Sequence, residues 1–183
     1  MVKLGSLKSV DKSNSTMQLF KILAVLSAGL FTHSAIACGN HDLAHMDMAL
    51  EGQRLDISLS VPADSLVHAG HQDSHAAIAT AKSLLEDPSQ TFAIPANAQC
   101  QPVRVQPDWN DIDHKHADGH MHVDVTVRYQ FTCDNPEQLT DVSVRLFEHF
   151  DALSKVKVQI IDQDSQHQME LNSDSANVAL QAE

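Results

Sequence analysis

Apolar and polar residues alternate over residues 43–50 and again over residues 55–61, which predicts two strands that each bury one face. The pair Glu51-Gly52 between them predicts a tight turn. The two runs should therefore pair as a hairpin. Its apolar side carries Met46 and Met48, which core packing explains, and its polar side carries His45 and Asp47.

A helical period replaces the alternation after Pro62. Ser74 or Asp73 can cap a helix that ends at Asp87-Pro88, because proline cannot continue the preceding turn. Its apolar stripe consists of Ala77, Ile78, Ala81, Leu84 and Leu85. The pattern predicts one amphipathic helix that packs on the sheet.

Strand patterns return in the second half of the chain. Val103 and Val105 indicate a short strand that Pro107 stops, and residues 121–133 alternate strictly. Further strands are expected at residues 142–146, 156–160 and 167–171, followed by a loose polar tail over 173–183. The fold class is therefore α+β, mainly an antiparallel β-sheet or sandwich with one helix, in a single domain over residues 38–172.

Residues 1–37 have the composition of a secretory signal peptide. Lys3, Lys8, Lys12 and Lys21 precede or open an apolar run at 22–31, and Ala35-Ile36-Ala37 supplies a small-x-small cleavage site. The true start lies at Met1 or at Met17, which directly precedes the tighter version of this leader. Export to the periplasm is expected from either start. Cleavage after Ala37 would expose Cys38, so a membrane-anchored lipoprotein is an alternative to ordinary cleavage.

Export places the cysteines in an oxidising compartment. Cys100 and Cys133 form the natural disulfide pair, closing a loop of about 33 residues. Ligation of a metal by these two sulfurs is the competing hypothesis.

The exported chain is strongly acidic. The whole sequence has 12 basic and 24 acidic residues, and removal of the leader takes away four lysines and Asp11, which leaves 8 against 23 and a net charge of −15. Such a field repels nucleic acid and anionic membranes, so neither is expected as a partner unless Cys38 carries lipid. The same field attracts cations.

Histidines are concentrated in a segment at residues 111–122, interleaved with aspartates. This loop carries His114, His116, His120 and His122, and imidazole suits Zn, Cu and Ni. His68 and His71, followed by His75, stand at helical spacings and form a second possible group. A solvated polar loop without metal is the competing interpretation.

Short motifs follow one another between Gly39 and Leu171: Ala49-Leu-Glu-Gly52, Val61-Pro62-Ala63, Leu66-Val67, Leu85-x-Asp87-Pro88, Phe92-x-Ile-Pro95-Ala96, Tyr129-x-Phe-x-Cys133 and Val144-Arg-Leu-Phe-Glu148. In this order they resemble the ZrgA family, exported bacterial zinc-binding proteins often found beside zinc-uptake transporters. The resemblance implies Zn²⁺ as the bound metal. By position it implies His41 and His71 as ligands, and it leaves a fixed N-terminal site dependent on His45, because the family's first histidine is replaced here.

The sequence thus predicts a non-catalytic periplasmic zinc-binding protein that supports uptake through a zinc-uptake transporter or its substrate-binding protein. Copper binding through histidine and methionine is a second hypothesis, prompted by His45-Met46-Asp47-Met48 and His120-Met121-His122. A zinc-dependent hydrolase with Glu148 or an aspartate as base is a third, although no His-Glu-x-x-His motif is present. A fourth is a partner-binding sandwich whose histidines are incidental.

Overall fold

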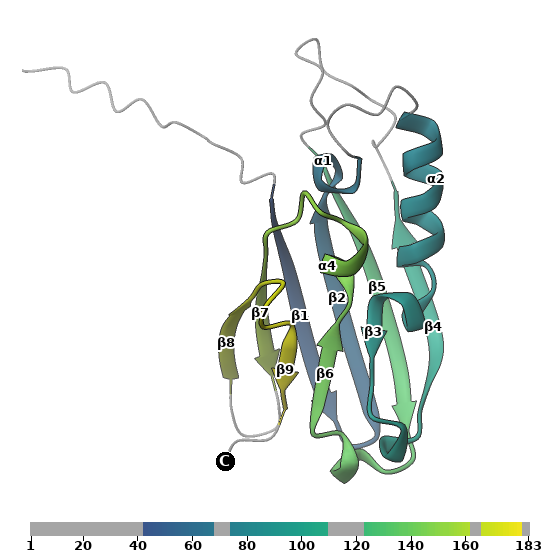
Figure 1. Cartoon of the computed structure of the whole chain (residues 1–183). Helices are drawn as coiled ribbons and strands as arrows, with labels where there is room; N and C mark the ends of the chain where they lie inside the picture. The colour runs from purple at the N-terminus through teal and green to yellow at the C-terminus, as the bar shows by residue number, and fades with distance from the viewer. Residues whose placement is uncertain (1–41, 68–73, 110–122, 162–165, 181–183) are drawn as a thin grey trace, which may run out of the picture. The chain divides into compact units, whose positions relative to one another are not determined.

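The computed structural model describes residues 42–67, 74–109, 123–161 and 166–180. Their strands form two sheets (Figure 1). The larger sheet has the order β4-β5-β2-β1-β7-β8 and the smaller one the order β3-β6-β9. The large sheet is built from β1 (Leu43–Glu51), β2 (Arg54–Pro62), β4 (Cys100–Asp108), β5 (Asp124–Cys133), β7 (Lys155–Ile161) and β8 (Gln166–Leu171).

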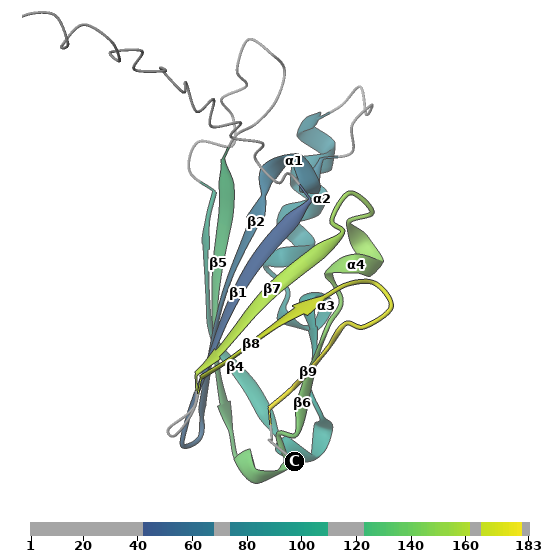
Figure 2. The ribbon, with the colours of Figure 1, turned by 90° about the vertical axis from the view of Figure 1, so that its left-hand side faces the viewer.

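The remaining elements cover one side of the large sheet (Figure 2). They are α1 (Ala63–Leu66), α2 (Ser74–Leu85), α3 (Pro88–Thr91), β3 (Phe92–Ala93), η1 (Ala96–Ala98), η2 (Pro136–Gln138), β6 (Asp141–Val144), α4 (Leu146–His149) and β9 (Asn177–Ala179). The core lies between the two layers, where alternate residues of β1, β2, β5 and β7 are buried. This confirms the α+β, mainly β class, with one long helix among single turns. None of the helices in the described ranges is long and apolar enough to span a membrane.

The hairpin of β1 and β2 is confirmed, but its turn lies one residue later than expected. Glu51 pairs with Arg54, so Gly52 and Gln53 form the loop and Met48 lies opposite Ile57. Gly52 adopts φ +57°, which a glycine at the first loop position of a tight hairpin tolerates without strain. The inward face is unchanged because the register moved by an even number of residues.

The sequence predicted a short strand at Val103 and Val105 that Pro107 stops, but neither Pro102 nor Pro107 limits this strand. β4 runs through both prolines from Cys100 to Asp108, with a bulge between Pro102 and Arg104. Proline is tolerated here because β4 is an edge strand, so one side of its backbone needs no partner in the sheet.

The C-terminal tail is not loose over its whole length. Asn177–Ala179 pairs with β6 as β9, and Val178 is fully buried. In the sequence Val178 stands in a short apolar run with Ala179 and Leu180, and this run gave no strand pattern. Its burial against the small sheet holds the segment in place.

One strand pair departs from hairpin order. β1 pairs with β7 in parallel, with Leu43 opposite Lys155. Parallel pairing requires a crossover, which β6 and α4 supply over the covered side. Both strands begin at the same end, where the Ser154 amide donates to the Asp42 carbonyl at 2.9 Å.

Candidate metal centre

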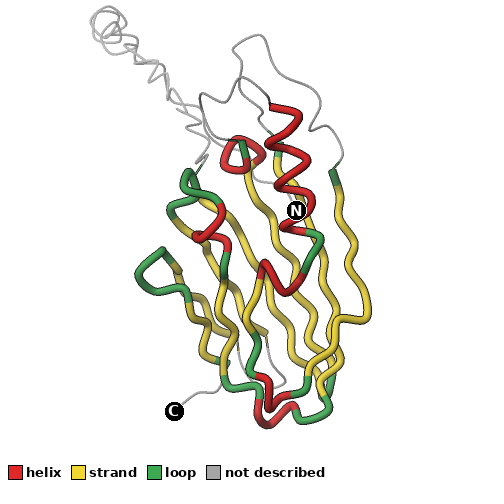
Figure 3. The backbone as a smooth tube through the Cα atoms, turned by 45° about the vertical axis from the view of Figure 1, so that its right-hand side comes forward, coloured by secondary structure: helices red, strands yellow, loops and turns green. Residues whose placement is uncertain are grey.

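The histidine-bearing segments attach to one end of the large sheet. Residues 68–73 lie between Val67, after α1, and the start of α2 at Ser74. Residues 110–122 lie between Trp109, at the end of β4, and Val123, at the start of β5. The Ala63 amide donates to the Val123 carbonyl at 2.9 Å and ties these two attachment points together. Figure 3 shows α1 and the first turn of α2 at this same end of the strands.

Asp42, the residue that follows His41 in the sequence, lies at this end as well, because β1 begins where the antiparallel β2 ends. Seven of the eight predicted ligands lie outside the described residues: His41, His68, His71, His114, His116, His120 and His122. The spacing of His120 and His122, two residues apart, predicts that they share a polar strand face, and this prediction also falls outside the described residues. The fold brings the attachment points of the segments together.

His45 is the one predicted ligand within the described part of the chain. It is exposed on the uncovered side of the large sheet, opposite Ser60 on β2 and Lys157 on β7. Ser60 Oγ in turn lies 3.2 Å from Asp124 Oδ2. In the described ranges no three His, Cys, Asp or Glu side chains are grouped closely enough to hold a metal ion. His45 would need ligands from other segments.

The two methionines next to His45 point away from it. Met46 and Met48 are each only 1% exposed and belong to the core, whereas His45 and Asp47 are exposed on the opposite side of β1. A thioether and an imidazole on opposite faces of one strand cannot bind the same ion. The His45-Met46-Asp47-Met48 motif therefore gives no support to copper binding.

Trp109 fixes the start of the 110–122 segment against α2. Its indole Nε1 donates to Glu86 Oε1 at 2.8 Å, and Lys82 Nζ lies 5.4 Å from the ring centroid. The sequence interpretation missed this contact. The only signal was the position of the chain's one tryptophan two residues before Asp111.

α2 is fixed to the large sheet at its C-terminal end. The buried Tyr129 hydroxyl donates to the Leu85 carbonyl, and burial raises the pKa of this phenol well above its ordinary value. Asp87 then caps α3 by accepting from the Ser89 hydroxyl at 2.7 Å and the Ser89 amide at 2.9 Å. These bonds lower the pKa of Asp87. The anchored helix gives His75, exposed in its first turn, a fixed position.

The other histidines in the described ranges are His149 and His167. His149 Nε2 lies 3.2 Å from the Gln90 carbonyl oxygen, and His167 is exposed on β8. Glu148, proposed as a hydrolytic base, accepts from Arg145 Nε and Nη2 at 3.2 and 3.1 Å. The guanidinium already occupies Oε2 of this carboxylate, so the described structure gives no support to Glu148 as a base.

The predicted disulfide is confirmed. Cys100 and Cys133 lie directly opposite each other on β4 and β5 and are joined by an S–S bond of 2.04 Å. The bond lies at the end of these strands opposite to Trp109 and Val123. Both sulfurs are used, so the hypothesis that they bind metal is wrong.

Comparison with protein-family models gives one match, described as the ZrgA family zinc uptake protein, over residues 39–180. A search of curated proteins returns no match. The matched span includes every strand of both sheets and all eight predicted ligands. The chain therefore belongs to the ZrgA family of zinc uptake proteins.

Proposed function

We propose that this protein is an exported, periplasmic zinc-binding protein that captures Zn²⁺ and supports its uptake through a transporter, without catalysing a reaction. The observation that carries the proposal is the common end of the sheet at which the segments with His41, His68, His71 and residues 114–122 attach. Membership of a zinc uptake family supports zinc as the cargo.

The donor set suits this cargo. Imidazole nitrogen and carboxylate oxygen are ordinary zinc ligands, and the net charge of −15 after removal of the leader attracts cations. Uptake requires release as well as capture. Protons compete with zinc for imidazole, so a site built from histidines can release the metal to a second protein as well as bind it.

Calorimetric titration of the protein with Zn²⁺ tests the proposal. Binding near neutral pH should weaken strongly at about pH 5.5, because protons compete for imidazole. Substitution of His114, His116, His120 and His122 by Ala should lower the zinc stoichiometry and leave the melting temperature of the metal-free protein unchanged. His167→Ala, on β8, is the matched control and should bind like the wild type.

The absence of zinc binding at micromolar concentration would refute capture. A loss of thermal stability without metal in the quadruple variant would instead give the histidine segment a structural role. Competition with Cu(I) under reducing conditions distinguishes zinc from copper.

The expected partner is the zinc-uptake transporter or its substrate-binding protein. Mixing the zinc-loaded protein with the purified substrate-binding protein should transfer the metal, followed as a change in the metal content of each after separation. Fractionation of cells tests the periplasmic location. The intact mass of the mature protein shows whether Cys38 is lipidated.

A further inference from the structure

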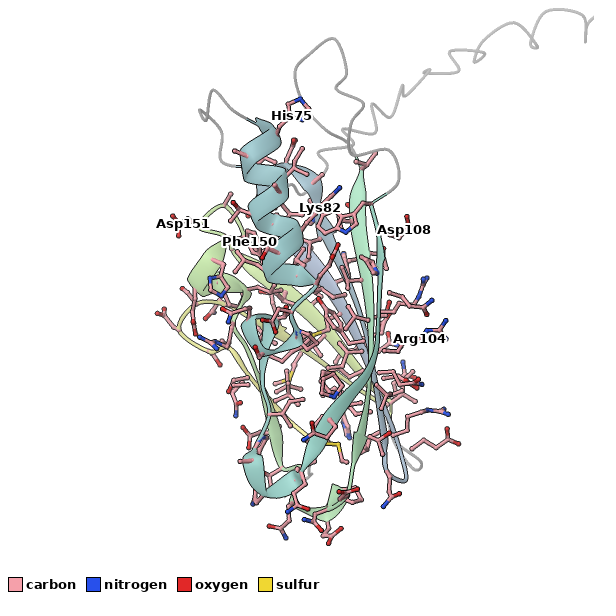
Figure 4. The ribbon with its side chains drawn as sticks, turned by 90° about the vertical axis from the view of Figure 1, so that its right-hand side faces the viewer. His75, Lys82, Arg104, Asp108, Phe150 and Asp151 are labelled. Carbon is pink, nitrogen blue, oxygen red and sulfur yellow. A yellow bond between two sulfur atoms is a disulfide. The ribbon has the colours of Figure 1, made fainter. Side chains whose placement is uncertain are left out.

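The large sheet has one side that nothing in the described part of the chain covers (Figure 2). We call its outward side chains on the six strands the open face. Figure 4 shows Arg104 and Asp108 on this side, away from α2. A shallow groove of about 270 Å³ crosses the open face between Arg104 on β4 and Ile161 on β7. Ile161 is 45% exposed, which is unusual for a large apolar residue in this fold.

The open face differs in charge from the rest of the molecule. It carries five of the eight basic residues of the exported chain and only six of its 23 acidic ones, so its own net charge is −1. The basic residues are Arg54, Arg104, Arg128, Lys155 and Lys157, and the acidic ones Asp47, Glu51, Asp56, Asp108, Asp124 and Glu170. The other 14 units of negative charge lie elsewhere. A second protein meets the least electrostatic repulsion on this face.

Two charged side chains at the centre of the open face lack partners within the described residues. Asp47 and Arg128 are exposed, and neither side chain makes an ion pair or hydrogen bond there. By contrast, Arg54 is paired with Glu51 at 2.7 Å and Asp56 at 2.9 Å. The unpaired acid and base are therefore available to a partner.

The strand register makes the pattern self-complementary. Asp47 and Arg128 flank Ser58 of β2 on opposite sides, one strand away each. A two-fold axis along β2 in the plane of the interface would place Arg128 of each copy opposite Asp47 of the other. In the next row the same operation places Lys157 opposite Asp108. In the third row it places the aliphatic part of Arg104 opposite Ile161.

We propose that two copies of this chain stack their open faces in a symmetric dimer whose two-fold axis runs along β2. Face-to-face sheets pack about 10 Å apart with strands within about 30° of each other, which long arginine and lysine side chains can span. At about 3.3 Å per residue and about 4.8 Å between strands, the six strands cover roughly 800 Å² per copy, near the ~800 Å² of an ordinary stable interface.

The mixed charge of the open face favours a second copy over the other occupants. The net charge of −15 of the exported chain disfavours an anionic membrane or a nucleic acid. In a second copy, by contrast, Asp47 meets Arg128 and Lys157 meets Asp108.

Ser58 and Ser60 on the axis are small enough for close approach. Arg54 and Asp56 also lie on the axis, and because they form an ion pair with each other they would meet the same pair of the other copy.

Sedimentation equilibrium of the full chain tests the dimer. Asp47→Arg replaces two ion pairs per dimer by like charges, and the dissociation constant should rise at least about ten-fold. The matched control is Asp174→Arg, which has the same charge change in the exposed turn after β8 and should leave the constant unchanged. Combining Asp47→Arg with Arg128→Asp restores opposite charges and should recover the dimer.

A wild-type protein that stays monomeric at high micromolar concentration would overturn the proposal, as would a dimer that Asp47→Arg does not weaken. Failure of the charge swap to recover association would refute the axis along β2. Crosslinking through introduced cysteines tests the dimer without the charge variants, in case one of those variants does not fold. In a Cys38→Ser background, Ser58→Cys should join two chains through a short bis-maleimide, and Ser173→Cys, in the turn after β8, should not.

Discussion

Removal of a single oxygen at Tyr129 tests how α2 is held on the sheet. Tyr129 is 2% exposed, and its ring packs edge-on against Phe92 with centroids 5.0 Å apart. Its hydroxyl donates to the carbonyl of Leu85, the last residue of α2. A helix leaves its last carbonyls without intrahelical donors, so this tyrosine satisfies one of them.

Tyr129→Phe keeps the ring and its packing but leaves the buried Leu85 carbonyl without this donor. An unsatisfied buried acceptor costs about 1–3 kcal/mol, and we expect a loss of roughly 1–2 kcal/mol in the free energy of unfolding. For a domain of this size that corresponds to a fall in melting temperature of roughly 3–6 °C.

Urea denaturation followed by circular dichroism measures this loss. Thr132→Val, which removes an exposed hydroxyl from the same strand, is the matched control and should change stability by less than about 0.5 kcal/mol. Because Tyr129 is the chain's one tyrosine, the absorbance of phenolate reports on it alone.

The pH dependence of stability tests the buried Tyr129 hydroxyl independently. Burial raises the folded pKa of Tyr129 above its ordinary value of 10.0. Its contribution to stability is therefore fully present below pH 10 and is lost as the pH rises toward the folded pKa. Phenolate should appear only together with unfolding. Wild-type stability in the Phe variant, together with ordinary titration near pH 10 in the folded wild type, would refute the buried hydrogen bond.

Three further predictions concern the parts that frame the candidate metal centre. Asp87→Ala should lower the free energy of unfolding, measured by urea denaturation, by about 1 kcal/mol. Because the folded pKa of Asp87 is lowered, this difference from the wild type should be full near neutral pH and should vanish as the pH falls through that pKa. Replacing both Cys100 and Cys133 by Ser should cost roughly 3 kcal/mol in the same melts without changing zinc stoichiometry; altered stoichiometry would contradict their distance from the histidine segments. Val178→Ala should lower the free energy of unfolding by about 1–3 kcal/mol in thermal denaturation, whereas Ala179→Ser, at an exposed position, should change it very little. Equal stabilities of these two variants would argue against β9 as part of the fold.

Local periodicity predicted the faces of the strands correctly. The alternation around Met46 and Met48 identified the core side of β1 because successive side chains of a strand point to opposite sides, whatever the strand pairs with. The same argument placed His45 outside. The helix over 74–85 and its end before Pro88 could also be predicted from the local sequence, because proline cannot continue the hydrogen bonds of the helix that it follows.

The candidate site was predictable in its chemistry but not in its geometry. Residue types and spacing identified imidazole donors, and the single pair of cysteines after Cys38 gave the disulfide. The contact of Trp109 with Glu86 joins residues 23 positions apart, and nothing in the pattern of either segment signals it. His45 and the methionines beside it looked like one ligand group in the sequence, and the pleat of β1 separated them.

The sequence by itself determined which faces of the strands and of the long helix are buried, which sulfurs pair and which donors a metal would meet. Only the tertiary structure decided that β1 pairs in parallel with β7, that β4 continues through two prolines at an edge, and that Val178 brings the tail into the small sheet. It also decided that the histidine segments attach at one end of the sheet. The physical reason is that the direction of a side chain follows from its own backbone, whereas strand partners depend on how distant segments together bury apolar surface and satisfy their backbone hydrogen bonds.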